Sequence, residues 1–211
     1  DWPASVTVTH RSNALCGYGP EQLRAIHELP DSATGDGARI AIVAAYDDPS
    51  VEENTNSYFS SVGAKPFAPG QYTHHAPGNP DASRCGGPSA WTVEQHLDVQ
   101  AVHAIAPDAD VVYWGADDCL TGSLYLRILD AAQDPTTPDA ISLSFGAPEE
   151  LDTDADRVLL HRVLAEAASL NVSAFASTGN DGDHSDYADH AHEPAVASPP
   201  STPYRSAQRR V

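Results

Sequence analysis

The sequence predicts an α/β fold with three layers, α/β/α, around a mostly parallel sheet. Three observations favour this fold. Short apolar runs of strand length recur along the chain, and segments of helix length separate them. Strands that alternate with helices are typical of parallel sheets, because each parallel pair needs a crossover connection. A chain of 211 residues, of which 41% are hydrophobic, can also bury a sizeable core as one domain.

Four apolar runs predict strands, at residues 39–45, 110–114, 140–144 and 172–177. The segment 63–90 is rich in glycine, proline and serine, which predicts a loop with at most one hairpin. In sheets of this kind the functional residues commonly follow the carboxyl ends of the strands. We therefore expect them at residues 46–48, 115–116, 144–146 and 177–180.

Five segments predict helices, at residues 20–29, 49–62, 89–106, 123–132 and 153–170. Proline marks several of their ends, since Pro30 and Pro107 each follow a helix and Pro49 stands in the first turn of one. Acidic residues early in the last helix suit the positive end of its dipole. Helices in these positions can cover both faces of the sheet through right-handed crossovers.

The chain is strongly acidic, with a net charge of −19 from 11 basic and 30 acidic residues. This sign excludes a general binder of nucleic acid or of an anionic membrane surface, because both repel an acidic protein. No apolar stretch approaches the roughly 20 residues of a membrane span. The ten histidines would all be charged near pH 4, where many carboxylates are protonated. The composition therefore suits a protein of acidic surroundings, or simply a soluble one.

The end of the sequence differs from the rest in charge. Residues 205–211 hold Arg205, Arg209 and Arg210 and no acidic residue. We therefore divide the chain into one domain, residues 1–204, and an atypical basic tail, residues 205–211.

Two acidic residues stand out in the predicted helix 89–106. Glu94 and Asp98 are four residues apart, so a helix places them on one face, together with apolar residues such as Leu97 and Ile105. The opposite face collects Gln95, His96, Gln100 and His103. Burial and a neighbouring negative charge both raise a carboxyl pKa, so the pair can hold one proton between two carboxylates. That arrangement suits general base catalysis at low pH. The structural alternative is that either acid pairs with an arginine or caps a neighbouring strand.

Several segments of the chain, in the same order, resemble one family of peptidases. They are residues 16–23, 39–49, 91–107, 142–146, 175–183 and 198–204. Together they resemble the sedolisins, the serine-carboxyl peptidases with a subtilisin-like fold. The most specific signal is the spacing of Glu94 and Asp98, followed by the segment that ends at Ala106 and Pro107. The resemblance implies an incomplete subtilisin-like domain, the N-terminal part of a catalytic domain.

The resemblance implies a secreted, acid-acting endopeptidase, with roles for particular residues. Glu94 would accept the proton of a catalytic serine, and Asp98 would orient and tune Glu94. A glutamate suits this task in acid, because a histidine would already be protonated there. A peptide or protein substrate would pair with the backbone at the end of the strand 140–144. The implied substrate-binding residues are Trp91, Ser142, Ser144, Phe145 and Gly146. The alternative for Trp91 is a place in the core.

The oxyanion residue departs from the family pattern. The family has an aspartate in a Ser-Gly-Asp context, and Asn180 stands at the corresponding position. An asparagine amide donates a hydrogen bond at any pH, whereas a carboxyl group donates only when it is protonated. Asn180 can therefore serve, and Asp181 can serve after a shift of one residue. Gly179 and Asn180 can also form a tight turn without a catalytic role.

The catalytic serine of the family is not found in this sequence. The family places it in a Gly-Thr-Ser motif far downstream, with a calcium site near the C-terminus, and no Gly-Thr-Ser occurs in the 211 residues. We therefore expect no calcium site, no other metal and no cofactor in this chain. A truncated or frameshifted gene copy, a processed fragment or an engineered end would explain the difference, and a separate C-terminal half could supply the serine. The rival interpretation is an inactive homologue or remnant that at most binds peptides.

The resemblance also implies a disulfide. Cys16, Cys85 and Cys119 permit three different single disulfides, and the sequence has no C-x-x-C pair. On the family's layout Cys85 and Cys119 bracket the helix that carries the two acids, which makes them the expected pair. Cys16 would then be free or paired elsewhere. A disulfide indicates an oxidising compartment, which agrees with an extracellular protein.

Two weaker candidates remain. A subtilisin would use Asp47 or Asp48 after the first strand, but it also needs a His-Gly-Thr-His motif, which the helix with His96 and His103 lacks. Histidines and acids at residues 184–193 could bind a divalent metal, although a solvated surface loop explains them better. The dipeptide at 74–75 is also expected at the surface.

Overall fold

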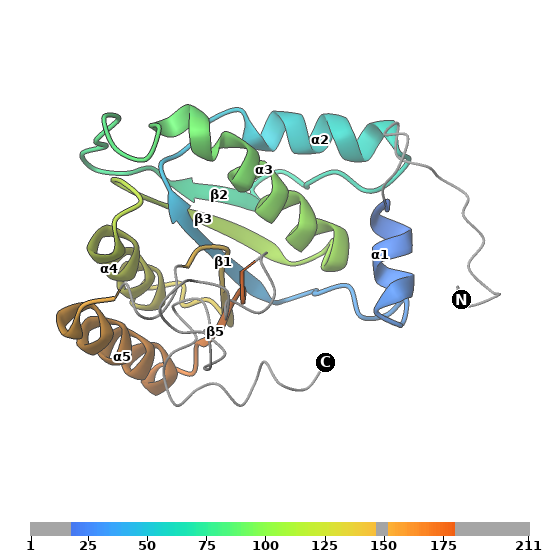
Figure 1. The fold of residues 1–211 in the computed structure, drawn as a ribbon. Helices are drawn as coiled ribbons and strands as arrows, with labels where there is room; N and C mark the ends of the chain where they lie inside the picture. Colours follow the sequence, from blue (N-terminus) through green and yellow to red (C-terminus); the bar gives the residue numbers. More distant parts are fainter. Residues whose placement is uncertain (1–17, 147–151, 180–211) are drawn as a thin grey trace, which may run out of the picture.

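The computed structural model describes residues 18–146 and 152–179, and its core is a five-stranded sheet (Figure 1). The strands are β1 Arg39–Ala45, β2 Tyr72–His75, β3 Asp110–Ala116, β4 Ala140–Leu143 and β5 Ser173–Ala176. They lie in the order β2-β3-β1-β4-β5, and every neighbouring pair is parallel. The predicted α/β class is therefore confirmed, and the four predicted strands are present with small differences at their ends.

Helices form a layer on each face of this sheet (Figure 1). Helices α2 Val51–Ser61 and α3 Pro88–Ile105 lie on one face, and α1 Pro20–Ile26 packs against α3. Helices α4 Thr121–Ala132 and α5 Asp154–Ser169 pack together on the other face. Side chains of β1 alternate between the two apolar clusters, with Val43 in the cluster under α4 and α5, and Ile42 in the cluster under α2 and α3. The central strand is thus buried on both faces, as is typical of parallel sheets.

The segment 63–90 contains a strand that the sequence did not reveal. β2 pairs in parallel with β3 at the edge of the sheet, so the hairpin that the composition allowed is absent from this segment. Only Tyr72 of this strand is buried, and the three residues after it are exposed. An edge strand of this kind lacks the apolar run by which buried strands are recognised. His74 and His75 are exposed, as predicted.

The polar side of α3 does not face solvent, contrary to what the helical pattern indicates. Gln95 and His103 are both buried, because α2 packs against this side of the helix. Oε1 of Gln95 accepts a hydrogen bond from the backbone N–H of Asp48 at 2.7 Å, and Nε2 of His103 lies 2.8 Å from the carbonyl oxygen of Lys65. The ring of His103 also packs on Phe67, with 4.0 Å between the ring centroids. Polar side chains with such hydrogen-bond partners can be buried, so the polarity of these residues wrongly predicts that this side of α3 faces solvent.

Candidate functional site

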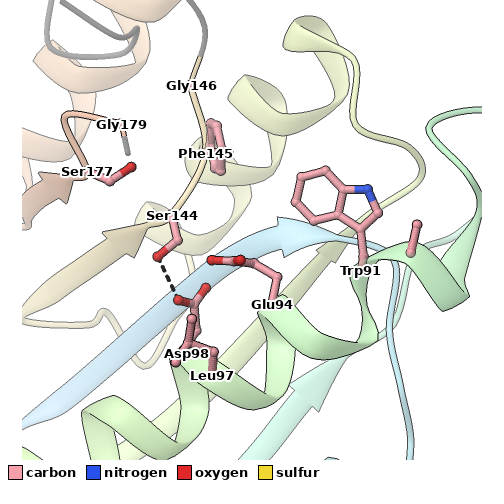
Figure 2. A pocket seen from close by; sticks show the side chains of 10 residues that line it. Trp91, Glu94, Leu97, Asp98, Ser144, Phe145, Gly146, Ser177 and Gly179 are labelled. Carbon is pink, nitrogen blue, oxygen red and sulfur yellow. Dashed lines mark hydrogen bonds between the residues drawn. The ribbon is translucent and has the colours of Figure 1, made fainter. Parts of the chain in front are cut away.

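A cavity of about 680 Å³ lies at the carboxyl ends of β4 and β5, beside the N-terminal half of α3 (Figure 2). The described residues that line it are Ala90, Trp91, Glu94, Leu97, Asp98, Ser144, Phe145, Gly146, Ser177 and Gly179. The cavity therefore lies where functional residues are expected in a parallel sheet of this type. Residues of α3, of the segment after β4 and of the segment after β5 meet there.

The cavity brings together most of the residues singled out in the sequence. Trp91, Glu94 and Asp98 from α3 face Ser144 and the two residues that follow it (Figure 2). Ser142 does not line the cavity, since it lies within β4 and pairs with β1 and β5 in the sheet.

Four lining residues were not predicted individually as site residues: Ala90, Leu97, Ser177 and Gly179. Leu97 lies on the same helical face as Glu94, but it is 59% exposed and so is not part of the core. Ser177 and Gly179 follow β5, and their only signal in the sequence is their place after a strand. Trp91 lines the cavity and also packs against both apolar clusters, so it is partly in the core, and its role in substrate binding stays a prediction.

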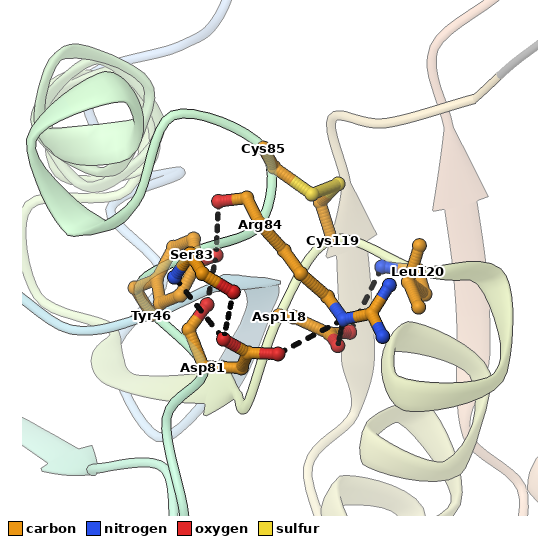
Figure 3. The surroundings of a disulfide bond; sticks show 8 residues. All are labelled: Tyr46, Asp81, Ser83, Arg84, Cys85, Asp118, Cys119 and Leu120. Carbon is orange, nitrogen blue, oxygen red and sulfur yellow. Dashed lines mark hydrogen bonds and ion pairs between the residues drawn. A yellow bond between two sulfur atoms is a disulfide. The ribbon is translucent and has the colours of Figure 1, made fainter.

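The start of α3 is held in place by a disulfide and by a turn that requires glycine. Cys85 and Cys119 form a disulfide, the pair that the family resemblance implies (Figure 3). Gly87, the residue before the helix, has a φ of 71°, and a Cβ there would lie 2.8 Å from the carbonyl oxygen of Ala82. Only glycine fits this conformation without strain. Pro88 then opens the helix, in the position that proline favours.

Hydrogen bonds tie the same loop to the end of β1 (Figure 3). The hydroxyl of Tyr46 donates to the carbonyl oxygens of Asp81 and Arg84, at 3.0 and 2.8 Å. The guanidinium of Arg84 forms a salt bridge of 3.0 Å with Asp81 and a longer one of 3.5 Å with Asp118. These contacts fix the loop that leads into α3, and so fix the position from which Glu94 reaches the cavity.

The two acids of α3 lie in surroundings that favour their protonated forms. Asp98 is only 7% exposed, and its Oδ1 accepts a hydrogen bond of 2.6 Å from the hydroxyl of Ser144. Burial raises the pKa of Asp98 to about 6; the hydrogen bond from Ser144 opposes this shift and the charge of Glu94 adds to it. Burial also raises the pKa of Glu94 above its ordinary value. The predicted environment of the pair, a partly buried face with like charges close together, is therefore present.

The structural alternatives for the pair receive unequal support. Among residues 18–146 and 152–179, no lysine, arginine or histidine forms a salt bridge with Glu94 or Asp98. The arginine pairing is thus absent from the part of the chain that the structure describes. The contact of Asp98 with Ser144 joins α3 to the residue directly after β4, so Asp98 does bind the end of a neighbouring strand.

A second acidic group follows β1, at Asp47 and Asp48. Nδ1 of His74 lies 2.9 Å from Oδ1 of Asp47, and Nδ1 of His96 lies 4.0 Å from Asp48. None of these four residues lines the cavity. His103, the other histidine of α3, is buried on the far side of the helix. The geometry therefore gives no support to a subtilisin-type arrangement of these acids and histidines.

Several predicted features lie outside the described residues. They are Asn180, Asp181, Cys16, the segment 184–193 and the tail 205–211. Within the described part of the chain, no group of three or more histidines, cysteines and acids could hold a metal ion. No described helix combines the length and the apolar character that crossing a membrane requires.

Comparison with known proteins supports the family resemblance. Kumamolisin from Bacillus sp. (strain MN-32) is 30% identical over 176 residues, which is 82% of this chain and 30% of kumamolisin. The resemblance to the sedolisin family is confirmed. No family model matches the chain.

Solved structures agree on the fold of these sedolisin-like residues. The Pseudomonas sedolisin, a serine-carboxyl proteinase complexed with two molecules of pseudo-iodotyrostatin, matches with a TM-score of 0.69 and 18% identity. The match covers 89% of this chain and 52% of that structure. A lanthipeptide protease matches with a TM-score of 0.50 and 20% identity, over 88% of this chain and 50% of that structure. The subtilisin-like α/β fold is thus confirmed, and the chain spans only part of the length of its relatives.

Proposed function

We propose that this chain is the part of a secreted, acid-acting serine-carboxyl endopeptidase that carries the general base and the substrate-binding strand. The observation that carries the proposal is the pair of Glu94 and Asp98, which faces a cavity at the carboxyl end of the sheet. The similarity to kumamolisin, and to a sedolisin described as a serine-carboxyl proteinase, supports the reaction class.

Glu94 is the general base in this proposal. The raised pKa values keep one proton on the pair in mildly acidic solution, with Asp98 the residue that holds it more strongly. Glu94 can then accept the proton of a serine hydroxyl as that oxygen attacks the peptide carbonyl carbon. The proton next passes to the amine that leaves when the peptide bond breaks, and the serine is left as an acyl ester. Glu94 then accepts a proton from a water molecule that attacks this ester, the peptide acid is released, and the proton returns to the serine oxygen.

The substrate is an extended peptide that lies along residues 144–146. These residues follow β4 and line the cavity, and backbone N–H and C=O groups there can pair with a peptide strand. Beyond Trp91 and Phe145 lies a second cavity of about 210 Å³, whose other walls include Leu124 and Tyr125. This smaller cavity is suited to an apolar side chain of the substrate.

The remaining parts of the machinery are proposals from the family resemblance. Asn180, or Asp181 after a shift of one residue, stabilises the oxyanion, and a C-terminal segment supplies the serine and the calcium site. That segment is either part of the same gene product or a second chain. The disulfide of Cys85 with Cys119 supports an oxidising, extracellular location.

The test is cleavage of fluorescein-labelled casein at pH 4 by this chain and by the full product of its gene. We expect Glu94→Gln to lower kcat by about 10²- to 10⁴-fold, because an amide cannot accept the proton. Glu53→Gln is the matched control, since it removes an exposed carboxylate from α2 and should leave cleavage unchanged. Equal rates for Glu94→Gln and the unchanged protein would overturn the proposed base.

The second candidate is an inactive homologue that binds peptides without cleaving them. The absence of a Gly-Thr-Ser motif from the 211 residues favours it for the chain alone. In that case neither the chain nor the full gene product cleaves casein, but both bind casein peptides. Loss of binding on widening the cavity with Phe145→Gly would place those peptides at residues 144–146.

A further inference from the structure

The hydroxyl of Ser144 binds a catalytic-site carboxylate, whereas the family resemblance assigns this residue to the substrate. Its Oγ lies 2.6 Å from Oδ1 of Asp98, which makes a short, charge-assisted hydrogen bond (Figure 2). Asp98 is 7% exposed, and its other oxygen, Oδ2, is buried and has no hydrogen-bond partner among the described residues. The two oxygens of one carboxyl group are therefore in different situations.

The groups around Asp98 leave Ser144 as its donor within the described part of the chain. Glu94 faces Asp98 from the same helix, and its negative charge favours a proton on the pair. Tyr113 of β3 is the titratable group that faces it from the sheet, and the hydroxyl of Tyr113 donates to the carbonyl oxygen of Ala45. No cation among residues 18–146 and 152–179 forms a salt bridge with Asp98.

We propose that Ser144 is a positioning residue that holds Oδ1 of Asp98 and so leaves Oδ2 to share a proton with Glu94. The proposal rests on the proposed function, because it gives the pair its catalytic orientation. Without the hydroxyl, the carboxyl group of Asp98 can rotate, and either oxygen can take the proton. Ser144 therefore acts on catalysis through Asp98 and not through contact with the reacting atoms.

The hydrogen bond has a consequence for titration. A donor that binds the charged form of a carboxyl group lowers its pKa, and Ser144 acts in this direction on Asp98. Removal of the hydroxyl should therefore raise the pKa of the second proton loss of the coupled pair, in which Asp98 ionises, by about one pH unit. A threonine at position 144 keeps a hydroxyl on Cβ and should restore the original titration.

Carboxyl ¹³C NMR titration of the chain tests this directly, and it needs no catalytic serine. The carboxyl signals are assigned with Glu94→Gln and Asp98→Asn, and the titration is then followed in Ser144→Ala and Ser144→Thr. Ser177→Ala is the matched control, because Ser177 lines the same cavity but forms no hydrogen bond with Asp98. We expect an upward shift for Ser144→Ala and the original curve for Ser144→Thr and Ser177→Ala. Amide spectra of each variant establish that it is folded.

Two results would overturn the proposal. One is a folded Ser144→Ala variant that titrates like the unchanged chain, and the other is a folded Ser144→Thr variant that titrates like Ser144→Ala. Failure of the proposed function is a separate result, because it appears as the absence of casein cleavage by the full gene product. Where that product does cleave casein, the alkaline limb of its pH profile, which reports the loss of the Asp98 proton, should shift upward with Ser144→Ala and return with Ser144→Thr.

Discussion

Two pairs of acids lie at the same carboxyl edge of the sheet, and the pKa values of Asp48 and Asp98, one from each pair, are shifted in opposite directions. Asp48, in the turn after β1, has a pKa below its ordinary value: burial raises the pKa, but hydrogen bonds from Ser50 and the charge of His96 outweigh it. Asp98, in the cavity, has its pKa raised to about 6, because burial outweighs one hydrogen bond from Ser144. Asp98 is 7% exposed and the side chain of Asp48 is 21% exposed, so Asp98 is the more deeply buried of the two.

The two carboxylates also differ in the number of hydrogen-bond donors that contact them. Oδ1 of Asp48 accepts from the backbone N–H of Ser50 at 2.9 Å and from its hydroxyl at 2.7 Å, an arrangement that turns the chain into α2. Asp98 accepts from one hydroxyl and keeps a buried oxygen without a partner among the described residues. A carboxylate with several hydrogen-bond donors stays ionised and stabilises a turn. A buried carboxylate with few donors keeps its proton to a higher pH, and it is the better candidate for catalysis.

The largest expected effect is on the pH dependence of stability, through Asp98→Asn. A carboxyl group whose pKa is higher in the folded state stabilises the fold most below its unfolded pKa, and this stabilisation disappears as the pH rises through about 6. For Asp98 the change between pH 3 and pH 8 is about 2–3 kcal/mol, since each pKa unit corresponds to about 1.4 kcal/mol. Asp98→Asn removes this dependence and keeps an oxygen that accepts from Ser144. Urea unfolding at several pH values measures it.

A matched control separates the effect of removing a buried carboxyl group from the effect of removing a negative charge. Asp154→Asn removes a carboxylate whose side chain is 97% exposed, and it should leave the shape of the pH curve unchanged. If Asp98→Asn and the unchanged chain show parallel curves, the contrast between the two pairs of acids is wrong.

The next effect is that of Asp48 on stability, which is smaller and which falls, rather than rises, as the pH is lowered. Asp48→Ala should destabilise the chain by about 1 kcal/mol at pH 7, because the backbone N–H of Ser50 loses its acceptor at the start of α2. The pKa of Asp48 is lowered in the folded state, so its contribution is present above the unfolded pKa and is lost as the pH falls through the folded pKa. Thermal unfolding at pH 7 and pH 3 compares the two conditions. An equal loss at both would contradict the role of the ionised form.

The contrast also shows which features the sequence could predict. The apolar runs identified β1, β3, β4 and β5, and the spacing of Glu94 and Asp98 placed both acids on one helical face. These are local patterns, set by the geometry of one strand or one helix. The expected disulfide came from the family resemblance, since three cysteines permit three pairings.

Features that depend on packing between elements were not predictable in this way. The contact of Ser144 with Asp98 joins residues 46 apart in the chain, and it depends on how α3 sits against β4. The burial of Gln95 depends on contact with α2, and the sequence of α3 gives no sign of that contact. The edge strand β2 lacks the apolar pattern of a strand, and its extended conformation depends on pairing with β3. Tertiary context overrides the local signal in each case.

The smallest expected effect concerns the other acid of the turn, Asp47. Its Oδ1 lies 2.9 Å from Nδ1 of His74, and the side chains of His74 and Asp47 are 41% and 10% exposed, so the pair is a partly buried salt bridge when the histidine is protonated. His74→Ala should therefore cost about 0.5–1 kcal/mol at pH 5, and the loss should fall in 1 M NaCl, where the exposed charge is screened. His27→Ala is the control, because His27 is exposed and has no salt bridge within the described residues. Urea unfolding at low and high salt measures both variants. A salt-independent loss well above 1 kcal/mol for His74→Ala would mean that Asp47 depends on its histidine as strongly as Asp48 depends on Ser50, and that hydrogen bonds alone do not distinguish the turn from the cavity.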